Sequence, residues 1–283
     1  MVEPPSVEVT ILPADRFSVR GDHAERIQKF VEVAAANWQL PSLPNCEINA
    51  QAPADHTGLG VGTQLGLAIA AGLRRFLQLP ELPIELLAKS VGRGQRSAIG
   101  TYGFQLGGLI VDADKCQGDQ LGALARRVEI PAAWRFVLIR SADAQGLAGD
   151  REIDAFAKLP PVPESVTREL WRITNEQMVP AVEAGDCGAF GEAVYQFGRL
   201  AGECFSIVQS GAFASPRIAE LVAVIRGFGV AGAGQSSWGP TVFAVVADGA
   251  EAERVVSWLR GRDLSGADIT IARANNSGAV IES

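Results

Sequence analysis

Apolar positions along the first 130 residues switch between the two spacings that distinguish strands from helices. Alternation with a period of two predicts a strand over residues 7–12, with residues 15–19 as its hairpin partner or continuation, and shorter strands are predicted over residues 46–50 and 109–112. Spacings of three and four residues predict helices over residues 24–38, 65–77 and 83–91. Asp22 followed by Glu25 indicates a capping box at the first helix. Residues 92–108 are predicted to form a glycine-rich loop.

The second half of the chain carries longer helical patterns between short strands. Helices are predicted over residues 164–184 and 186–209, with Gly185 ending the first and Asp186 capping the second. A third helix begins at Ser215 and Pro216. The remaining elements are strands at residues 134–139, 241–246 and 268–272 and a helix at residues 250–259. We place the domain boundary near residues 128–131, which gives two α+β domains of residues 1–130 and 131–283.

The composition is that of a globular protein with a large core, and it excludes several classes of function. The chain has 283 residues, of which 47% are hydrophobic, and a net charge of −7. That charge argues against a general nucleic-acid binder, because such proteins neutralise phosphates with clustered Lys and Arg. No uncharged apolar run approaches the roughly eighteen residues of a membrane span, and no basic and then apolar leader begins the chain. We therefore predict a cytoplasmic protein that binds neither nucleic acid nor membranes.

The cysteines and histidines restrict the chemistry further. The four cysteines form no C-x-x-C pair, which is typical of reduced thiols. The chain has two histidines, His23 and His56, so a zinc site built on histidine is not expected. A histidine-based catalytic triad would depend on His56.

Three glycines at alternate positions, Gly58, Gly60 and Gly62, precede the apolar helix predicted to begin at residue 65. Free backbone N–H groups and the positive end of a helix dipole make such a loop a site for phosphate. The loop matches neither G-x-G-x-x-G nor a loop that ends in Lys-Ser or Lys-Thr. A glycine-rich turn packed against the helix is the alternative.

Two further segments extend this candidate site. Residues 232–240, Gly-Ala-Gly-Gln-Ser-Ser-Trp-Gly-Pro, are small and polar, and we expect them to form a second wall of the same pocket. Within residues 92–108, Arg93 and Arg96 stand among glycines, where a guanidinium can bind a carboxylate or phosphate in a bidentate manner. Solvated arginines on a surface loop are the alternative.

Four motifs in order resemble those of one enzyme family. The segment Gly58-Leu-Gly-Val-Gly-Thr-Gln64 is similar to the phosphate loop of the GHMP superfamily of small-molecule kinases. Together with Arg96-Ser-Ala-Ile-Gly-Thr101, Gly107-Gly-Leu-Ile-Val-Asp112 and Gly234-Gln-Ser-Ser-Trp-Gly-Pro240, it resembles β-ribofuranosylaminobenzene 5'-phosphate synthase. The resemblance spans essentially the whole chain.

The resemblance implies a fold, a reaction and its partners. The fold would be the GHMP-kinase-like two-domain α+β fold, with a left-handed β-α-β unit in the N-terminal domain and a ferredoxin-like C-terminal domain. The reaction would join phosphoribosyl pyrophosphate to 4-aminobenzoate or 4-hydroxybenzoate with loss of CO2 and pyrophosphate, in tetrahydromethanopterin biosynthesis. Mg2+ would neutralise the pyrophosphate. A homodimer is implied as well.

The resemblance also assigns roles to residues of the motifs. Arg96 and Thr101 would be catalytic. The phosphate-binding residues would be Gly58, Leu59, Gly60, Val61, Gly62, Thr63 and Gln64. The substrate-binding residues would be Arg93, Ser97, Gly234, Gln235, Ser236, Ser237 and Trp238. The metal ligands stay unassigned.

Two departures from the family pattern leave alternatives open. A first strand with a Ser-Arg-Leu-His-Phe-Gly-like motif has no match here. Either the start codon is placed too late, which leaves the assignment intact, or this member lacks that strand, and then an inactive ligand-binding homologue is one alternative. An ATP-dependent small-molecule kinase of the superfamily is the other. Residues 96–104 contain no Asp or Glu to activate a hydroxyl group, which disfavours a kinase, although Asp112 or Asp114 could substitute.

Overall fold

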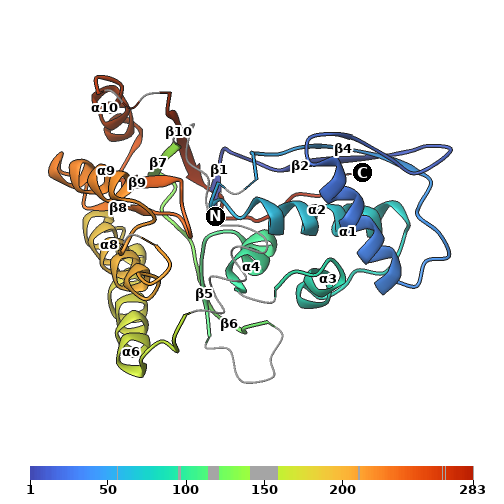
Figure 1. Cartoon of the computed structure of the whole chain (residues 1–283), viewed down its shortest axis with the longest axis horizontal. Helices are drawn as coiled ribbons and strands as arrows, with labels where there is room; N and C mark the ends of the chain where they lie inside the picture. The colour runs from blue at the N-terminus through green and yellow to red at the C-terminus, as the bar shows by residue number, and fades with distance from the viewer. Residues whose placement is uncertain are drawn as a thin grey trace.

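The structure is a computed structural model, and it describes residues 1–55, 57–94, 97–113, 121–140, 159–209, 211–262, 264 and 266–282. Two sheets with their helices lie side by side along the long axis of the molecule, and the short hairpin β5–β6 lies between them (Figure 1). Among the described residues, no helix has the length and apolar character needed to cross a bilayer.

The first sheet has three strands in the order β2 (Glu8–Pro13), β4 (Cys46–Gln51) and β3 (Ser18–Gly21). Strand β2 is antiparallel to β4, whereas β3 is parallel to it, and α1 (Ala24–Asn37) connects β3 to β4 as a β-α-β unit. The prediction that residues 15–19 pair with or continue the first strand is therefore wrong. Parallel strands need a crossover connection, and α1 with its buried apolar stripe provides one.

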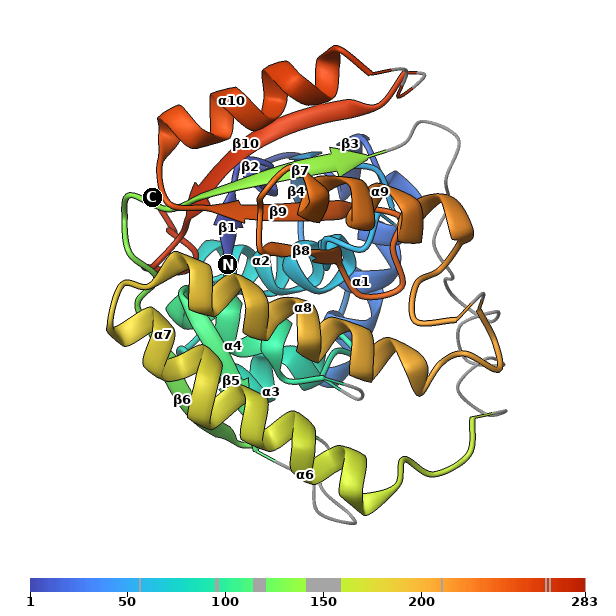
Figure 2. The ribbon, with the colours of Figure 1, turned by 90° about the vertical axis from the view of Figure 1, so that its left-hand side faces the viewer.

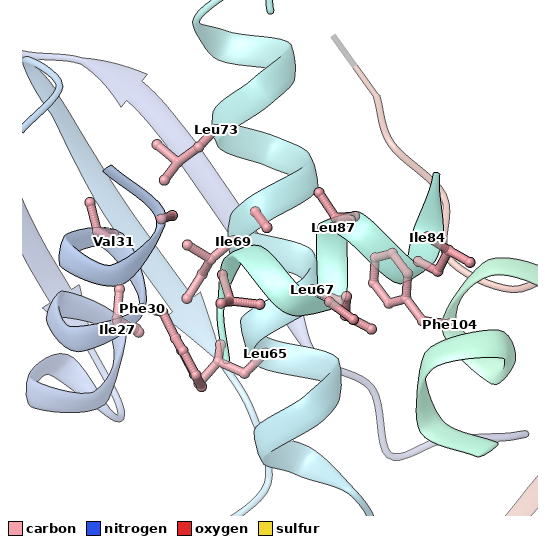
Figure 3. Packing of buried hydrophobic residues seen from close by; sticks show 14 of the residues in the cluster. Ile27, Phe30, Val31, Leu65, Leu67, Ile69, Leu73, Ile84, Leu87 and Phe104 are labelled. Carbon is pink, nitrogen blue, oxygen red and sulfur yellow. The ribbon is translucent and has the colours of Figure 1, made fainter. Parts of the chain in front are cut away.

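Three further helices pack beside this sheet: α2 (Val61–Phe76), α3 (Ile84–Ser90) and α4 (Ile99–Leu106). Figure 3 shows the side chains of α1, α3 and α4 converging on α2. Leu65, Ile69 and Leu73 of α2 are at most 1% exposed, which confirms the apolar stripe predicted from their spacing. Helix α2 begins four residues earlier than predicted, because Gly60 takes the left-handed conformation that starts it.

Two local predictions in this half are wrong. Residues 99–106 form α4 and not a loop, because Tyr102 and Phe104 are buried in the core, and tertiary packing outweighs the poor helix propensity of the glycines. The capping box at Asp22 is absent, since His23 occupies the cap position with φ 62° and no side chain caps the helix.

The second sheet has five strands in the order β1 (Val2–Glu3), β10 (Asp268–Ala274), β7 (Arg135–Arg140), β9 (Val242–Val246) and β8 (Gly232–Gln235). Every neighbouring pair is antiparallel. The last four strands have the chain order and spatial order of a ferredoxin-like domain, as predicted.

Helices cover both faces of this sheet, as Figure 2 shows from the side. Val137 and Ile139 of β7 face α9 (Pro216–Gly227) and α10 (Gly249–Arg260), whereas Phe136 and Leu138 face α7 (Val179–Glu183) and α8 (Cys187–Glu203). The helix predicted over residues 164–184 consists of α6 (Glu164–Arg172), the π-helical turn η1 (Ile173–Met178) and α7. The predicted side-chain caps Asp186 and Ser215 are confirmed.

Both ends of the chain cross to the other half. Strand β1 pairs with β10, and the Ala279 N–H donates to the Phe104 carbonyl at 2.6 Å, so the C-terminal segment returns to α4. Between the two sheets, β5 (Leu109–Asp112) pairs with β6 (Leu124–Val128), a strand that the sequence pattern did not indicate. The domain boundary at residue 130 stays a prediction.

Candidate functional site

The start of α2 leaves backbone amides open. The Gly60 carbonyl accepts hydrogen bonds from the Thr63 and Gln64 N–H groups at 3.0 and 3.2 Å, which closes the first turn. The N–H groups of Val61 and Gly62 have no partner among the described residues. No side chain caps the helix, and its first turn contains no acidic residue. The positive end of the helix dipole is therefore available to an anion.

The second glycine-rich segment lies directly against this loop. The Ser236 hydroxyl donates to the Gly58 carbonyl at 2.7 Å, and the Thr241 hydroxyl donates to the Thr57 carbonyl at 2.6 Å. Gly58 has φ +78°, and a Cβ there would lie 2.4 Å from the Ser236 carbonyl oxygen, so this contact requires glycine. The two segments, 178 residues apart in the sequence, meet as predicted.

The loop is accessible. Gly60 is exposed, and a Cβ added there would meet nothing within 4 Å. Leu59 is partly buried against the core of the second half. It borders a groove of about 1090 Å³ along β2 and α2, and also a smaller hollow of about 410 Å³ beside Thr241. At Gly60, therefore, the glycine turn is not hidden under packed side chains.

Several predicted substrate-binding residues of the second segment contact residues that hold the segment in place. The Gln235 side chain accepts from the Ala214 N–H at 2.7 Å and donates to the Ser237 carbonyl at 2.8 Å, so it holds the shape of the turn. Gly234 is buried on β8, where Phe243 lies 2.9 Å from the position of a Cβ. Trp238 packs edge-on against Phe205 with ring centroids 4.7 Å apart.

Helix α4 starts beside α2. The Gln64 side-chain amide donates to the Gly100 carbonyl at 2.9 Å. The Ser97 hydroxyl accepts from the Ile99 N–H at 3.2 Å, and the Asp112 carboxylate accepts from the Ala98 N–H at 3.3 Å. The predicted residue Arg96 lies outside the described residues, as do His56 and Asp114.

Thr101 lies on α4 with none of its surface exposed, and its hydroxyl has no hydrogen-bond partner among the described residues. An unpaired hydroxyl in a core costs free energy. The next residue, Tyr102, reaches the Glu85 carboxylate at 3.2 Å, and burial together with this hydrogen bond raises the pKa of Tyr102.

Two guanidinium groups share one aromatic ring next to the start of α2. Arg93 lies over the Phe30 ring with its guanidinium carbon 4.9 Å from the centroid, and Arg26 does so at 5.8 Å. Phe30 packs against Leu65 of α2 (Figure 3). Cations over an aromatic face are attracted by its quadrupole, so the ring helps to hold both side chains.

Arg26 belongs to a cluster at the entrance to the glycine loop. Its Nη1 donates to the Asp55 carboxylate, and His23 Nδ1 lies 2.9 Å from the other Asp55 oxygen. His23 Nε2 lies 3.0 Å from the Pro53 carbonyl oxygen. Both ring nitrogens thus face oxygen atoms. The cluster fixes residues 53–55, which lead into the loop.

Comparisons with known proteins show the family of the chain. A family model described as "GHMP kinases C terminal" matches residues 178–261. The beta-ribofuranosylphenol 5'-phosphate synthase of Archaeoglobus fulgidus is 30% identical over 257 residues, which cover 86% of this chain and 78% of that protein. The chain belongs to the beta-ribofuranosylphenol 5'-phosphate synthase family. The enzyme of that name from Methanothermobacter thermautotrophicus is 33% identical over 202 residues, or 67% of this chain and 60% of the relative.

Solved structures with a similar fold include several small-molecule kinases and a mevalonate diphosphate decarboxylase from Staphylococcus aureus. A homoserine kinase from Cytophaga hutchinsonii has a TM-score of 0.67 at 16% identity, over 98% of this chain and 89% of the other. The L. major mevalonate kinase in complex with R-mevalonate has a TM-score of 0.68 at 16% identity, over 96% and 87%. At this identity the likeness shows the GHMP-kinase-like fold alone, which confirms the predicted fold class.

The sequence motifs did not predict the cluster of His23, Arg26 and Asp55, because these residues come together only in the folded chain. One local signal existed. Arg26 lies in the first turn of a helix, where the dipole disfavours a cation, and it stands four residues before the buried Phe30. A basic residue in that position indicates a specific anionic partner.

Proposed function

We propose that this chain is a decarboxylating phosphoribosyltransferase that condenses phosphoribosyl pyrophosphate with 4-hydroxybenzoate or 4-aminobenzoate. The products are the C-ribosylated phenol or aniline 5'-phosphate, CO2 and pyrophosphate, as an early step of tetrahydromethanopterin biosynthesis. Membership of the synthase family is the observation that carries this proposal. The open amides at the start of α2, next to the second glycine-rich segment, support it as a place for the anionic donor.

The reaction balances with no additional reactant. The bond between ribose C1 and the pyrophosphate oxygen breaks, and the ring carbon that bears the carboxylate attacks C1. The bond from that ring carbon to the carboxylate then breaks, CO2 leaves, and the electron pair restores the aromatic ring. Negative charge grows on the departing pyrophosphate, so amide donors fixed in advance toward it lower the barrier. We assign this task to the Val61 and Gly62 N–H groups.

The arginines have two possible anions to bind. Arg93 lies over the ring of Phe30, and Phe30 packs against Leu65 near the start of α2. We propose that Arg93 contacts the benzoate carboxylate or the pyrophosphate. Arg96 keeps its proposed catalytic role from the resemblance. Thr101 has its hydroxyl buried, so we propose that it supports the start of α4 and does not touch the reacting atoms.

The ligands of the Mg2+ that the resemblance implies are not assigned. Across the described parts of the chain, no group of three or more His, Cys, Asp or Glu residues could hold a metal ion. Mg2+ stays a prediction from the resemblance, as do the homodimer and the cytoplasmic location.

A superfamily kinase is the second candidate. The fold is that of small-molecule kinases, and Asp112 presents its carboxylate at the start of α4, where it accepts from Ala98. An acid in this area could activate a hydroxyl group of an acceptor. The weaker point is that this carboxylate already holds the helix start.

One assay separates the two candidates. The full chain is incubated with phosphoribosyl pyrophosphate and carboxyl-labelled 4-hydroxybenzoate or 4-aminobenzoate in the presence of Mg2+, and labelled CO2 and pyrophosphate are measured. We expect equal amounts of both products. ADP formation from ATP with a panel of small alcohols, without CO2 release, would favour the kinase. Binding of phosphoribosyl pyrophosphate with no product in either assay would indicate an inactive ligand-binding homologue.

A further inference from the structure

We propose that Arg26 of α1 is an anion-binding residue of the site at the start of α2, and that Gly62 is glycine in order to admit it. This inference rests on the proposed function, since it names a further residue for the pyrophosphate group of the donor. The sequence motifs do not contain the pairing of Arg26 with Gly62, because the two residues lie on different helices.

The packing of α1 on α2 carries the first step. A Cβ on Gly62 would lie 2.0 Å from Arg26 Nη2, and a Cβ on Gly66 would lie 3.2 Å from the Phe30 ring. Two glycines one turn apart on α2 thus face two side chains one turn apart on α1. Nη2 lies against the backbone of Gly62, whose N–H is one of the open amides.

The hydrogen bonds of Arg26 carry the second step. Nη1 donates to Asp55, whereas Nη2 and Nε donate to no described residue. The side chain is 27% exposed, so those donors are partly open to solvent. A guanidinium presents its donors in a fixed fork, and one branch held by a carboxylate orients the other branches.

The charge balance carries the third step. Asp55 offsets the charge of Arg26, and Asp55 is itself bonded to His23. The first turn of α2 contains no acidic residue to offset the positive end of the helix dipole. An anion at the Val61 and Gly62 amides would complete the local balance, and Nη2 is placed to donate to it.

Inorganic pyrophosphate, titrated into the full chain in a calorimeter, tests the proposal. We expect Arg26→Gln to weaken pyrophosphate binding about tenfold, because it removes a charge-assisted donor. Arg26→Lys keeps the charge but loses the fork, so its affinity should lie between the two. Arg20→Gln is the matched control, since Arg20 is a largely exposed arginine paired with Glu47 on β4, and it should bind like the wild type.

Gly62→Ala is the second variant, and it protects the test against misfolding. The added methyl group displaces the Arg26 fork, so pyrophosphate binding should weaken several-fold. The thermal midpoint should hold or rise, because alanine is the better helix former. Wild-type affinity in Arg26→Gln overturns the role of Arg26, and wild-type affinity in Gly62→Ala overturns the claim that glycine is needed there to admit it.

Failure of the proposed function gives a different pattern. If the wild type releases no CO2 from labelled benzoate but Arg26→Gln still weakens pyrophosphate binding, the reaction assignment fails and the role of Arg26 stands. If the wild type turns over and the Arg26 variants bind pyrophosphate normally, the role of Arg26 fails alone. A wild type that binds no pyrophosphate at millimolar concentration contradicts both.

Discussion

The starts of α2 and α8 are built in opposite ways. Helix α8 has Asp186 as its cap, and this carboxylate accepts from the Ala189 N–H at 2.9 Å. Helix α2 has Gly60 in the same place, with no side chain to accept from its amides. One helix start supplies its own anion, and the other leaves its amides open. This difference is the one expected if the α2 start is a binding element, as proposed, and the α8 start is a structural one.

The cysteine at the start of α8 gives the largest test of this contrast. A helix N-terminus ordinarily lowers the pKa of a thiol. At Cys187, burial and the carboxylates of Glu251 and Asp186 instead raise the pKa to about 12. At pH 9 we therefore expect iodoacetamide to react with Cys187 roughly several-hundredfold more slowly in the folded chain than in urea, because the thiolate is the nucleophile.

Peptide mapping by mass spectrometry measures the alkylation of Cys187 separately from that of the other cysteines.

The raised pKa of Cys187 also makes the unfolding free energy depend on pH. Because the folded pKa lies above the unfolded value of 9.0, the unfolding free energy is unaffected below pH 9 and falls as the pH rises from 9 toward 12. Cys187→Ala should remove this contribution. Equal alkylation rates in folded and unfolded chains would show that the α8 start tolerates an anion.

Gly58→Ala should produce the next largest effect. The φ of +78° costs about 1–2 kcal/mol for alanine, and the new Cβ overlaps the Ser236 carbonyl oxygen. We expect the free energy of unfolding in urea to fall by about 3 kcal/mol, with loss of turnover. Gly60→Ala is the matched control, since φ is +70° but nothing lies within 4 Å, and it should cost about 1 kcal/mol. Equal losses would refute the close contact between the two segments.

Gly60→Asp converts the α2 start toward the α8 design. The carboxylate should repel pyrophosphate and weaken its binding about tenfold, while a negative charge near a helix N-terminus does not destabilise the fold. Aspartate tolerates the left-handed conformation of Gly60. Gly60→Asn has the same shape without the charge and should bind nearly as the wild type does. Calorimetry on both variants measures the difference, and unchanged affinity in Gly60→Asp would place the anion elsewhere.

Asp186→Ala should give the smallest effect. Loss of the cap leaves the Ala189 N–H without its acceptor and should lower the unfolding free energy by about 1 kcal/mol. Pyrophosphate affinity should not change, because α8 starts with a structural cap. Urea unfolding and calorimetry together make the measurement, and a change in affinity without a change in stability would reverse the assigned roles.

The sequence was sufficient for features that depend on neighbours along the chain. The stripe of Leu65, Ile69 and Leu73 and the cap at Asp186 follow from spacing and local chemistry. The resemblance of four motifs identified the family and the fold class, including the ferredoxin-like order of strands in the second half.

What the sequence missed depends on contacts between distant segments. Helix α4 forms because Tyr102 and Phe104 find a core, although its glycines favour a loop. Strand β1 has two residues and exists only by pairing with β10. The partnership of Arg26 and Gly62 joins two helices, and no local pattern specifies which glycine faces which side chain.

Backbone amide NMR of the full chain, titrated with phosphoribosyl pyrophosphate, compares the two helix starts in one experiment. The resonances of Val61 and Gly62 should move and saturate, whereas those of Gly188 and Ala189 at the α8 start should stay in place. Unmoved Val61 and Gly62 resonances, or equal shifts at both helix starts, would contradict the claim that the open amides of α2 bind the anionic donor.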